Sequence, residues 1–266
     1  MNILVTAGNT QTPIDQVRCI TNVFTGRTGA HVALTAHRRG HRVCLLTSHP
    51  EVVEELASGQ PPCVSRWRLR AYRTFDDLHR LMAEEVRQGA FDAVIHAAAV
   101  SDYSLAGVFT PAERTTFDPS ESAWKSEKGE PGLRAAGAGK VKNSHPELWF
   151  RLVPTPKLVD EIRAAWGFGG VLVKFKLEVG VTEADLLAIA DAARRQSRAN
   201  LVVANTLEGM CSWACIGRGG GRFEKVARAE LSARLLESVE ELTRGRLRPP
   251  RAGRPPGNSP SREVSV

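Results

Sequence analysis

Residues 2–8, NILVTAG, and residues 26–47, GRTGAHVALTAHRRGHRVCLLT, decide the fold of this chain. The first stretch is a short apolar run that ends in a glycine turn. The second begins with glycines, continues with apolar residues at helical spacing, and closes with another apolar run. A strand, a turn, a helix and a second strand in this order predict a βαβ unit, the building block of a parallel sheet.

The same alternation continues along most of the 266 residues, which is enough chain to bury a substantial core in one domain. We therefore predict an α/β fold, a Rossmann-like, doubly wound, mainly parallel sheet in a domain of residues 1–243. Expected strands lie at 3–6, 42–47, 68–72, 91–100, 170–177 and 201–205, and a late β-hairpin at 213–217 and 223–227. Expected helices lie at 29–39, 75–88, 155–166 (with Pro156 in the first turn), 182–199 and 229–243.

Two segments interrupt this pattern. Residues 104–139 are polar and lack sustained periodicity, and a loop of this length is typically a functional flap or a disordered insertion, with order resuming at 147–153. Residues 244–266 are rich in Pro, Gly and Ser and carry six arginines against one glutamate, which predicts a disordered basic tail. Since the tail holds most of the net charge of +7, we expect no specific nucleic-acid partner.

The chain has no run of about 18 apolar residues and no basic, apolar leader, so we expect no membrane partner, a start at residue 1 and a cytoplasmic location. The cysteines are odd in number, scattered and without a C-x-x-C pair, which argues against a disulfide framework or a zinc site. We expect them to be buried as small apolar residues. For Cys19, in the opening loop, a substrate contact and simple packing both stay open.

The glycines near the start do not form a dinucleotide fingerprint. A nicotinamide site predicts G-x-G-x-x-G directly after the first strand and an acidic residue ending the second, yet Gly26 and Gly29 come about twenty residues later and the second strand ends in Thr47-Ser48-His49. A P-loop is also absent. An NAD(P)-dependent reductase of extended Rossmann type and a basic polyanion-binding module remain alternatives. Residues 26–29 fit either an anion site at a helix start or ordinary capping.

Polar residues follow several of the expected strands. In an open α/β sheet, ligands bind beyond the carboxyl ends of the strands, where strand order reverses. The residues placed there are Gly8, Asn9, Thr10, Ser101, Asp102, Lys176, Glu178 and Asn205. Other candidates have plainer interpretations: Arg18 and Asn22 as loop braces, Lys140 as part of a solvated strand edge, and Phe175 as a core aromatic.

Six motifs, in order, resemble those of the phosphopantothenate–cysteine ligase (phosphopantothenoylcysteine synthetase) family. The opening residues 2–29 are similar to the family's strand, T-A-G-x-T turn, P-x-D-x-V-R segment, I-S-N triplet and S-S-G-x-x-G helix start. The other five are AAAVSDY (97–103), GKVKN (139–143), VPTPKLV (153–159), KFKLE (174–178) and VVAN (202–205). The resemblance covers about residues 2–210.

The resemblance implies a two-step ligation. The carboxylate of 4′-phosphopantothenate attacks the α-phosphate of CTP or ATP, with Mg²⁺ on the triphosphate, to form an acyl-nucleotide and pyrophosphate. The amine of cysteine then displaces the nucleoside monophosphate, giving 4′-phosphopantothenoylcysteine for coenzyme A biosynthesis. Bifunctional relatives carry an N-terminal flavin-dependent decarboxylase domain. Since nothing precedes Met1, the expectation is a stand-alone synthetase without flavin, and a homodimer as in the family.

The same resemblance assigns residues to roles. Asn22 and Lys140 are expected to be catalytic, handling the acyl-nucleotide and the triphosphate. Substrate binding is expected from Arg18, Asn22, Gly26, Gly29 and Asn205, and nucleotide binding from Ala97, Ala98, Asp102, Lys140, Pro156, Lys157, Leu158, Val159 and Phe175. No metal-ligating residue is assigned. The flap before Lys140 is expected to close over the nucleotide.

The chain departs from the family pattern at three places. The aspartate that usually follows the A-N pair is Thr206 here. Lysines of the preceding helix are absent, with Arg194, Arg195 and Arg198 as possible replacements. The string KFKLE is closer to the eukaryotic F-K-L-E-T than to the bacterial form. Because the bacterial members generally use CTP and the eukaryotic type ATP, both nucleotides stay open.

Overall fold

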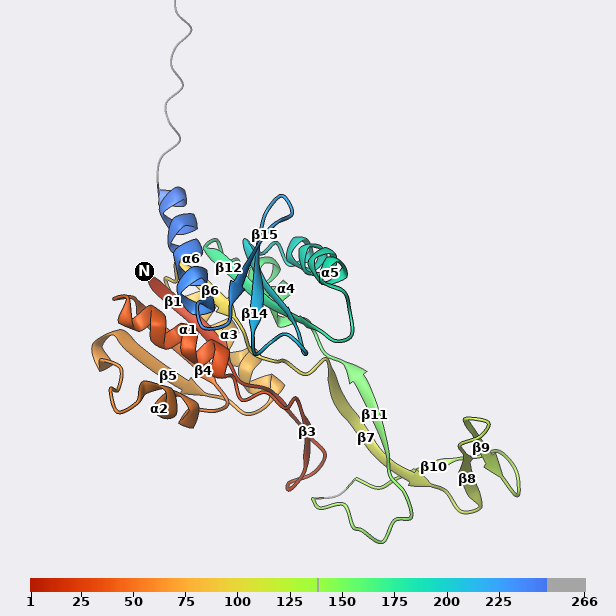
Figure 1. Ribbon diagram of the computed structural model, residues 1–266. Coiled ribbons are helices and arrows are strands. Elements are labelled where there is room, and N and C mark those ends of the chain that lie inside the picture. The colour runs from red at the N-terminus through yellow and green to blue at the C-terminus, as the bar shows by residue number, and fades with distance from the viewer. Residues whose placement is uncertain (138, 248–266) are drawn as a thin grey trace, which may run out of the picture.

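The computed structural model describes residues 1–137 and 139–247. Eight strands form one sheet in the order β15-β14-β13-β12-β6-β1-β4-β5 (Figure 1). The six strands from β13 to β5 pair in parallel with their neighbours. Strand β14 is antiparallel to both of its neighbours, β13 and β15. The predicted α/β, mainly parallel sheet with a late hairpin is confirmed. The strands are β1 (Asn2–Ala7), β4 (Arg42–Thr47), β5 (Trp67–Ala71), β6 (Ala93–His96), β12 (Val171–Glu178), β13 (Leu201–Thr206), β14 (Trp213–Arg218) and β15 (Arg222–Ala227).

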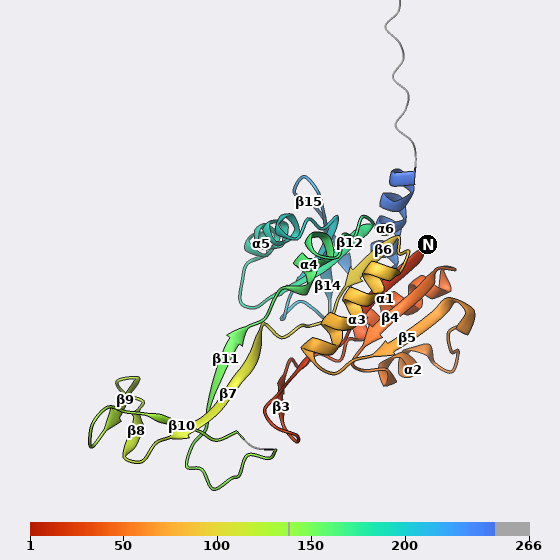
Figure 2. The same ribbon diagram turned by 180° about the vertical axis from the view of Figure 1, so that it is seen from behind.

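Helices cover both faces of the sheet (Figures 1 and 2). Alternate residues of each strand point to opposite faces, so Val5 of β1 packs in one buried cluster and Leu4 in another. On the side of Val5 lie α1 (Arg27–Arg38), α2 (Glu51–Ala57) and α6 (Leu231–Leu247); on the other lie α3 (Phe75–Gln88), α4 (Leu158–Ala164) and α5 (Glu183–Gln196). A 3₁₀ turn, Val64–Arg66, precedes β5.

Several boundaries differ from the sequence-based expectations. Helix α6 begins at Leu231 and continues to Leu247, so residues 244–247 are helical and the predicted tail was wrong there; residues 248–266 lie outside the described residues. Strand β6 ends at His96, because the small residues 97–100 leave the sheet. Only Cys44 and Cys215 are buried, so the expectation of burial was wrong for Cys19, Cys63 and Cys211.

The predicted flap forms much of a structured β-arm, from its base outward, that projects away from the sheet (Figure 1). Its long pair is β7 (Tyr103–Pro111) with β11 (Trp149–Pro154), and β10 (Leu133–Ala135) adds to the other edge of β7. At its end, β8 (Thr115–Asp118) pairs with β9 (Ala123–Ser126), and the rings of Phe117, Trp124 and Trp149 pack at centroid distances of 4.5–5.2 Å. The expectation of an unpatterned flap was wrong: the arm has its own strands and returns only at Pro154.

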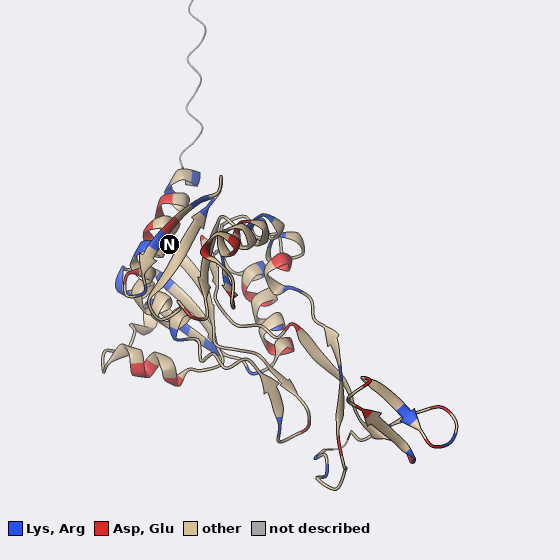
Figure 3. Ribbon diagram, turned by 45° about the vertical axis from the view of Figure 1, so that its right-hand side comes forward, with Lys and Arg blue, Asp and Glu red and all other residues tan. Residues whose placement is uncertain are grey.

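The opening loop holds a short hairpin, β2 (Gln11–Pro13) with β3 (Cys19–Thr21), which projects on the same side as the arm (Figure 1). Basic and acidic residues are interspersed over the body and the arm (Figure 3). In the described part of the chain, no helix has the length and apolarity that a membrane span requires.

Candidate functional site

A cavity of about 860 Å³ opens at the carboxyl ends of the parallel strands. Strand order reverses between β1 and β6, because β4 follows β1 on one side while β12 follows β6 on the other. Loops after these strands diverge at such a point and leave a crevice. The cavity is lined there by residues that follow β1, β6 and β13, by the last residues of β12, by the first turn of α1 and by the start of α6.

Three glycines shape the wall beside α1. Gly8 has φ +91° and Gly26 has φ +79°, a left-handed conformation that favours glycine. A Cβ on Gly26 would lie 2.0 Å from the Gly8 backbone nitrogen, and one on Gly29 would lie 2.7 Å from the Ala7 Cβ. Gly8 therefore makes the turn, Gly26 allows two backbones to touch, and Gly29 lets α1 pack closely on β1.

The roles of a dinucleotide fingerprint are thus present, but the β2–β3 hairpin separates the first glycine from the other two. Gly26 lines the cavity, whereas Gly29 is buried beneath it and acts through packing. Gly26 is the N-cap of α1, and no side chain caps this end. The first N–H groups of α1 and the positive end of its dipole therefore face the cavity, an arrangement that stabilises bound anions.

The cavity brings together several of the residues predicted from the sequence: Gly26, Ala97, Ala98, Phe175 and Asn205 all line it. Asn22 lies at its edge beside lining residue Val23. The Asn22 side-chain amide donates to the Ala99 carbonyl at 3.1 Å, and the Asn22 carbonyl accepts from the Asn9 amide at 2.5 Å. These two bonds fix the Asn22 backbone to the loop after β1 and its side chain to the loop after β6.

Two predicted residues, Arg18 and Lys140, lie together but outside the lining of the cavity. Arg18 is at the tip of the β2–β3 hairpin, where its guanidinium pairs with Asp15 at 2.6 Å and donates to the Val141 carbonyl at 2.8 Å. The Val141 N–H donates a hydrogen bond of 3.0 Å to the Asp15 carboxylate. These contacts hold the pKa of the Asp15 carboxyl well below its usual range. These hydrogen bonds hold the tip of the β2–β3 hairpin against the arm segment that contains Lys140.

The remaining predicted nucleotide-binding residues lie at the base of the arm. Asp102 and Lys157 form an exposed ion pair, and Pro156 next to them is also exposed. Leu158 is 2% exposed and packs in the core against α3, with Val159 beside it. The Leu158 side chain therefore cannot line a nucleotide site. None of these five residues belongs to the lining of the large cavity.

The arginines considered as replacements for the family lysines also lie elsewhere. Arg194 and Arg195 both pair with Asp191 near the end of α5, Arg194 at 2.9 Å, and Arg198 follows directly. Helix α5 leads into β13, so its C-terminus lies at the amino edge of the parallel strands. That edge is opposite to the cavity, and the suggestion that they contact phosphate was wrong.

Sequence reasoning missed one wall of the cavity, which contains His31, Met210, Cys211, Arg228 and Ser232. His31 Nδ1 and Ser232 Oγ lie 2.8 Å apart and join α1 to α6. Because β15 is reached through two antiparallel steps, it runs in the direction of β13 and ends at the same edge of the sheet. The sequence did contain a signal for this wall, namely the predicted hairpin. Its second strand ends at this edge of the sheet, and Arg228 directly follows it.

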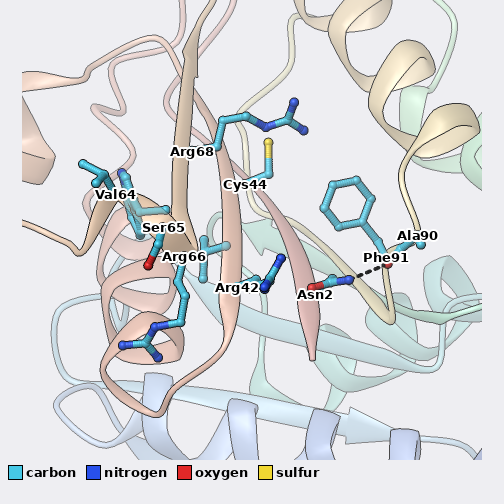
Figure 4. Close-up of a pocket in the computed structure, with 11 residues that line it drawn as sticks. Asn2, Arg42, Cys44, Val64, Ser65, Arg66, Arg68, Ala90 and Phe91 are labelled. Carbon is cyan, nitrogen blue, oxygen red and sulfur yellow. Dashed lines mark hydrogen bonds between the residues drawn. The ribbon is translucent and has the colours of Figure 1, made fainter.

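A second hollow, of about 310 Å³, lies at the opposite, amino edge of the strands (Figure 4). Asn2, Arg42 and Cys44 line it, and Asn2 donates to the Ala90 carbonyl at 3.0 Å. Burial raises the pKa of the Cys44 thiol to about 11, so the thiol stays protonated. No residue predicted for the site lines this hollow, and the larger cavity is the candidate site.

A buried polar pair supports the strand ends next to the cavity. His96 Nδ1 lies 2.9 Å from Thr6 Oγ1. Lys174 of β12 is the register neighbour of His96 on the adjacent strand β6. The Lys174 ammonium donates to the Ala193 carbonyl at 3.1 Å. Burial, with the nearby Lys174 charge, lowers the pKa of His96 to about 4. His96 is therefore neutral near pH 7.

This pKa predicts a loss of stability in mild acid. The imidazole of the unfolded chain, with a pKa of 6.5, takes up its proton first as the pH falls, so the free energy of unfolding decreases between pH 6.5 and about 4. We expect His96 to account for about 3 kcal/mol of this decrease. Urea unfolding of the wild type and His96→Gln at pH 7 and pH 4.5 measures it. Equal pH dependence in both proteins would contradict the assignment.

The family model described as DNA/pantothenate metabolism flavoprotein C-terminal domain matches residues 1–112. The chain is also 28% identical, over 90% of its length, to the Coenzyme A biosynthesis bifunctional protein CoaBC of Thermococcus kodakarensis. These two similarities support the resemblance to the phosphopantothenoylcysteine synthetase family. The chain spans about half of that relative, 51% of its length, and is 33% identical over 108 residues to the Escherichia coli K12 protein of the same name, of which it covers 24%.

Two solved structures superpose on this chain. The DNA/pantothenate metabolism flavoprotein from Streptococcus pneumoniae superposes with a TM-score of 0.70 and 26% identity, covering 91% of this chain and 99% of that one. A Cab2 mutant in complex with phosphopantothenate-cysteine superposes with a TM-score of 0.65 and 18% identity, covering 92% and 86% of the two chains. The second similarity shows that the fold is shared.

Proposed function

We propose that this chain joins 4′-phosphopantothenate to cysteine through an acyl-nucleotide, giving 4′-phosphopantothenoylcysteine in coenzyme A biosynthesis. The observation that carries the proposal is the cavity where strand order reverses. Its walls contain the uncapped N-terminus of α1, the small residues Ala97 and Ala98, and no acidic residue among those described. Such a cavity suits a substrate with several phosphate groups.

The residues supply positioning and charge for two displacement steps. A carboxylate oxygen of phosphopantothenate attacks the α-phosphorus, and pyrophosphate leaves; the cysteine amine then attacks the acyl carbon, and the nucleoside monophosphate leaves with that oxygen. The α1 N–H groups would stabilise phosphate charge, Phe175 would contact the base, and Asn22 would hydrogen-bond the intermediate. Since no carboxylate lines the cavity, Mg²⁺ would arrive on the triphosphate as part of the substrate.

The test is pyrophosphate release in the presence of 4′-phosphopantothenate, cysteine and Mg²⁺, with ATP and CTP tried separately. Release that requires both acid and nucleotide, with amide formed when cysteine is added, is the expected result. The nucleotide that supports faster release is the natural one, since the cavity leaves both possible. Release with neither nucleotide would contradict the proposed function. We expect the reaction to take place in the cytoplasm.

A homodimer would place Arg18 and Lys140 in a cavity. Both lie on extensions that project from their own body, and these extensions expose apolar side chains: Val17, Ile20 and Val23 near the hairpin, and Tyr103, Phe150 and Leu152 on the arm. Strand β11 is also an open sheet edge. Exposed apolar residues beside an open edge favour protein association. In this proposal the arm and hairpin of one subunit close over the cavity of the other.

Mixing inactive variants tests this arrangement. If Arg18 serves the partner's cavity and Asn22 its own, mixed dimers of Arg18→Ala and Asn22→Asp subunits contain one complete site. After unfolding and refolding an equal mixture, we expect about a quarter of wild-type activity, because half of random dimers are mixed and one of their two sites is intact. A monomer in sedimentation, or a mixture no more active than its components, would contradict shared sites.

A further inference from the structure

Arg228 is a half-buried cation in the wall of the cavity that faces the start of α1. It directly follows the end of β15 at Ala227, in the short connection to α6. Its guanidinium contacts Thr28 Oγ1, a side chain in the first turn of α1. Arg228 therefore spans two elements that are 200 residues apart in the sequence and meet beside the uncapped helix end.

Arg228 forms no ion pair with any carboxylate of the residues that the structure describes. Arg39 pairs with Glu240 at 2.8 Å, and Arg70 with Glu85 at 2.6 Å. Arg163 is also half-buried without an ion pair, but its guanidinium donates to the Phe168 carbonyl at 2.6 Å and to the Asn200 side-chain oxygen at 2.7 Å. Among the described residues, the guanidinium of Arg228 has the Thr28 hydroxyl as its hydrogen-bond partner and no such oxygen pair. Burial lowers the pKa of Arg228 from its usual value, although the group remains fully charged near pH 7. A desolvated charge without a counter-ion is costly, which indicates that an anion from outside the chain completes the pair.

The other residues that line the cavity also indicate an anionic ligand. Two other lining cations are already neutralised: Arg27 by Glu55 at 2.6 Å, and Lys176 by Glu178 at 2.8 Å. No aspartate or glutamate is present among the described lining residues. Arg228 is thus the cation of this lining whose charge is not balanced within the described chain.

We propose that Arg228 binds a phosphoryl group of a substrate, holding it between its guanidinium and the first turn of α1. This rests on the proposed function for the identity of the substrate, but the anion site itself does not. A guanidinium presents a planar fork of donors that matches two phosphate oxygens, while the α1 N–H groups approach the others. The bond to Thr28 keeps the fork oriented before the ligand arrives.

Two substrates of the proposed reaction carry phosphoryl groups: the nucleotide, with its triphosphate, and phosphopantothenate, with its 4′-phosphate. The probes are therefore tripolyphosphate and 4′-phosphopantothenate, titrated separately by calorimetry into the wild type, Arg228→Gln and Arg228→Lys. We expect Arg228→Gln to weaken one of the two probes at least tenfold, since a charge-assisted bond is lost. Arg228→Lys should recover part of the affinity. The probe that weakens identifies the phosphate that Arg228 holds.

The matched control is Arg222→Gln, which removes the same charge from the exposed start of β15, outside the cavity. It should bind both probes as the wild type does. Equal affinity of Arg228→Gln and the wild type for both probes, or equal weakening by Arg222→Gln, would overturn the proposal. So would a wild type that binds neither probe.

A second measurement on the wild type does not depend on how Arg228→Gln folds. Phenylglyoxal modifies arginine side chains, and the weakened probe should protect Arg228 while leaving Arg222 reactive in the same sample. Unprotected Arg228 at saturating probe would overturn the proposal. If phosphate binding and protection are found but no nucleotide supports pyrophosphate release, the proposed function fails while the anion site stands.

Discussion

Gly26→Ala is expected to abolish ligase activity and to lower the free energy of unfolding by about 3 kcal/mol or more. The new Cβ would meet the Gly8 nitrogen at 2.0 Å and the Gly8 Cα at 2.6 Å, and these are backbone atoms that cannot rotate away. The residue would also keep φ +79°, which is unfavourable for alanine. Relief of the clash must move the loop after β1 or the start of α1, and both line the cavity. Urea unfolding and the ligase assay measure the two effects.

Gly59→Ala is the control that separates backbone conformation from contact. Gly59 has φ +77°, but no atom lies within 4 Å of the position of its added Cβ. Its alanine variant should lose only about 1 kcal/mol and keep full ligase activity. Similar losses in the two variants would show that the backbone contact between Gly26 and Gly8 does not shape the site.

Asn22→Asp is expected to lower amide formation more than a hundredfold while pyrophosphate release stays measurable. The Asn22 amide now donates to the Ala99 carbonyl, and a carboxylate in its place would face that oxygen and an anionic intermediate. Loss of a bond to a charged group together with repulsion is worth about 3 kcal/mol or more. Single-turnover assays that follow pyrophosphate and amide in parallel separate the two steps.

The matched control is Gln60→Glu, which makes the same amide-to-carboxylate change at an exposed turn after α2. It should form amide at the wild-type rate, since only the net charge of the protein changes. Wild-type amide formation by Asn22→Asp would be incompatible with its assigned role in handling the intermediate.

The sequence predicted those elements whose signals are local. Helix α3 occupies the expected residues because Thr74 and Asp77 form a capping box and acidic residues occupy its first turn. Helix α2, with seven residues and no side-chain cap, gave no comparable signal. The three-residue strands of the opening hairpin were missed for the same reason. Strand β7 pairs with β11 about forty residues later, and its residues alternate weakly because the arm has little core on either face.

Of the residues predicted from strand ends, Gly8, Lys176 and Asn205 line the candidate site. The family resemblance, and not the strand-end rule, pointed to four further lining residues, Gly26, Ala97, Ala98 and Phe175. The pairing of Arg18 with the segment around Lys140 could not be predicted, because the two are over 120 residues apart and meet through side-chain hydrogen bonds to the Val141 backbone. The family motifs placed both in one site without showing that they project from the body. Arg228 was missed because it follows an antiparallel strand, whereas the rule for ligand binding at strand ends concerns parallel ones.

In the proposed reaction, the carboxylate of 4′-phosphopantothenate is activated by bonding to the α-phosphorus of a nucleotide. Transfer of ¹⁸O tests it most directly: the substrate is labelled in both carboxylate oxygens, and the nucleoside monophosphate is analysed by mass spectrometry after turnover with cysteine. Turnover through an acyl-nucleotide should leave one ¹⁸O atom in each monophosphate released and one in the amide. Unlabelled monophosphate formed together with amide would contradict it, because the oxygen would then not have passed through an acyl-nucleotide.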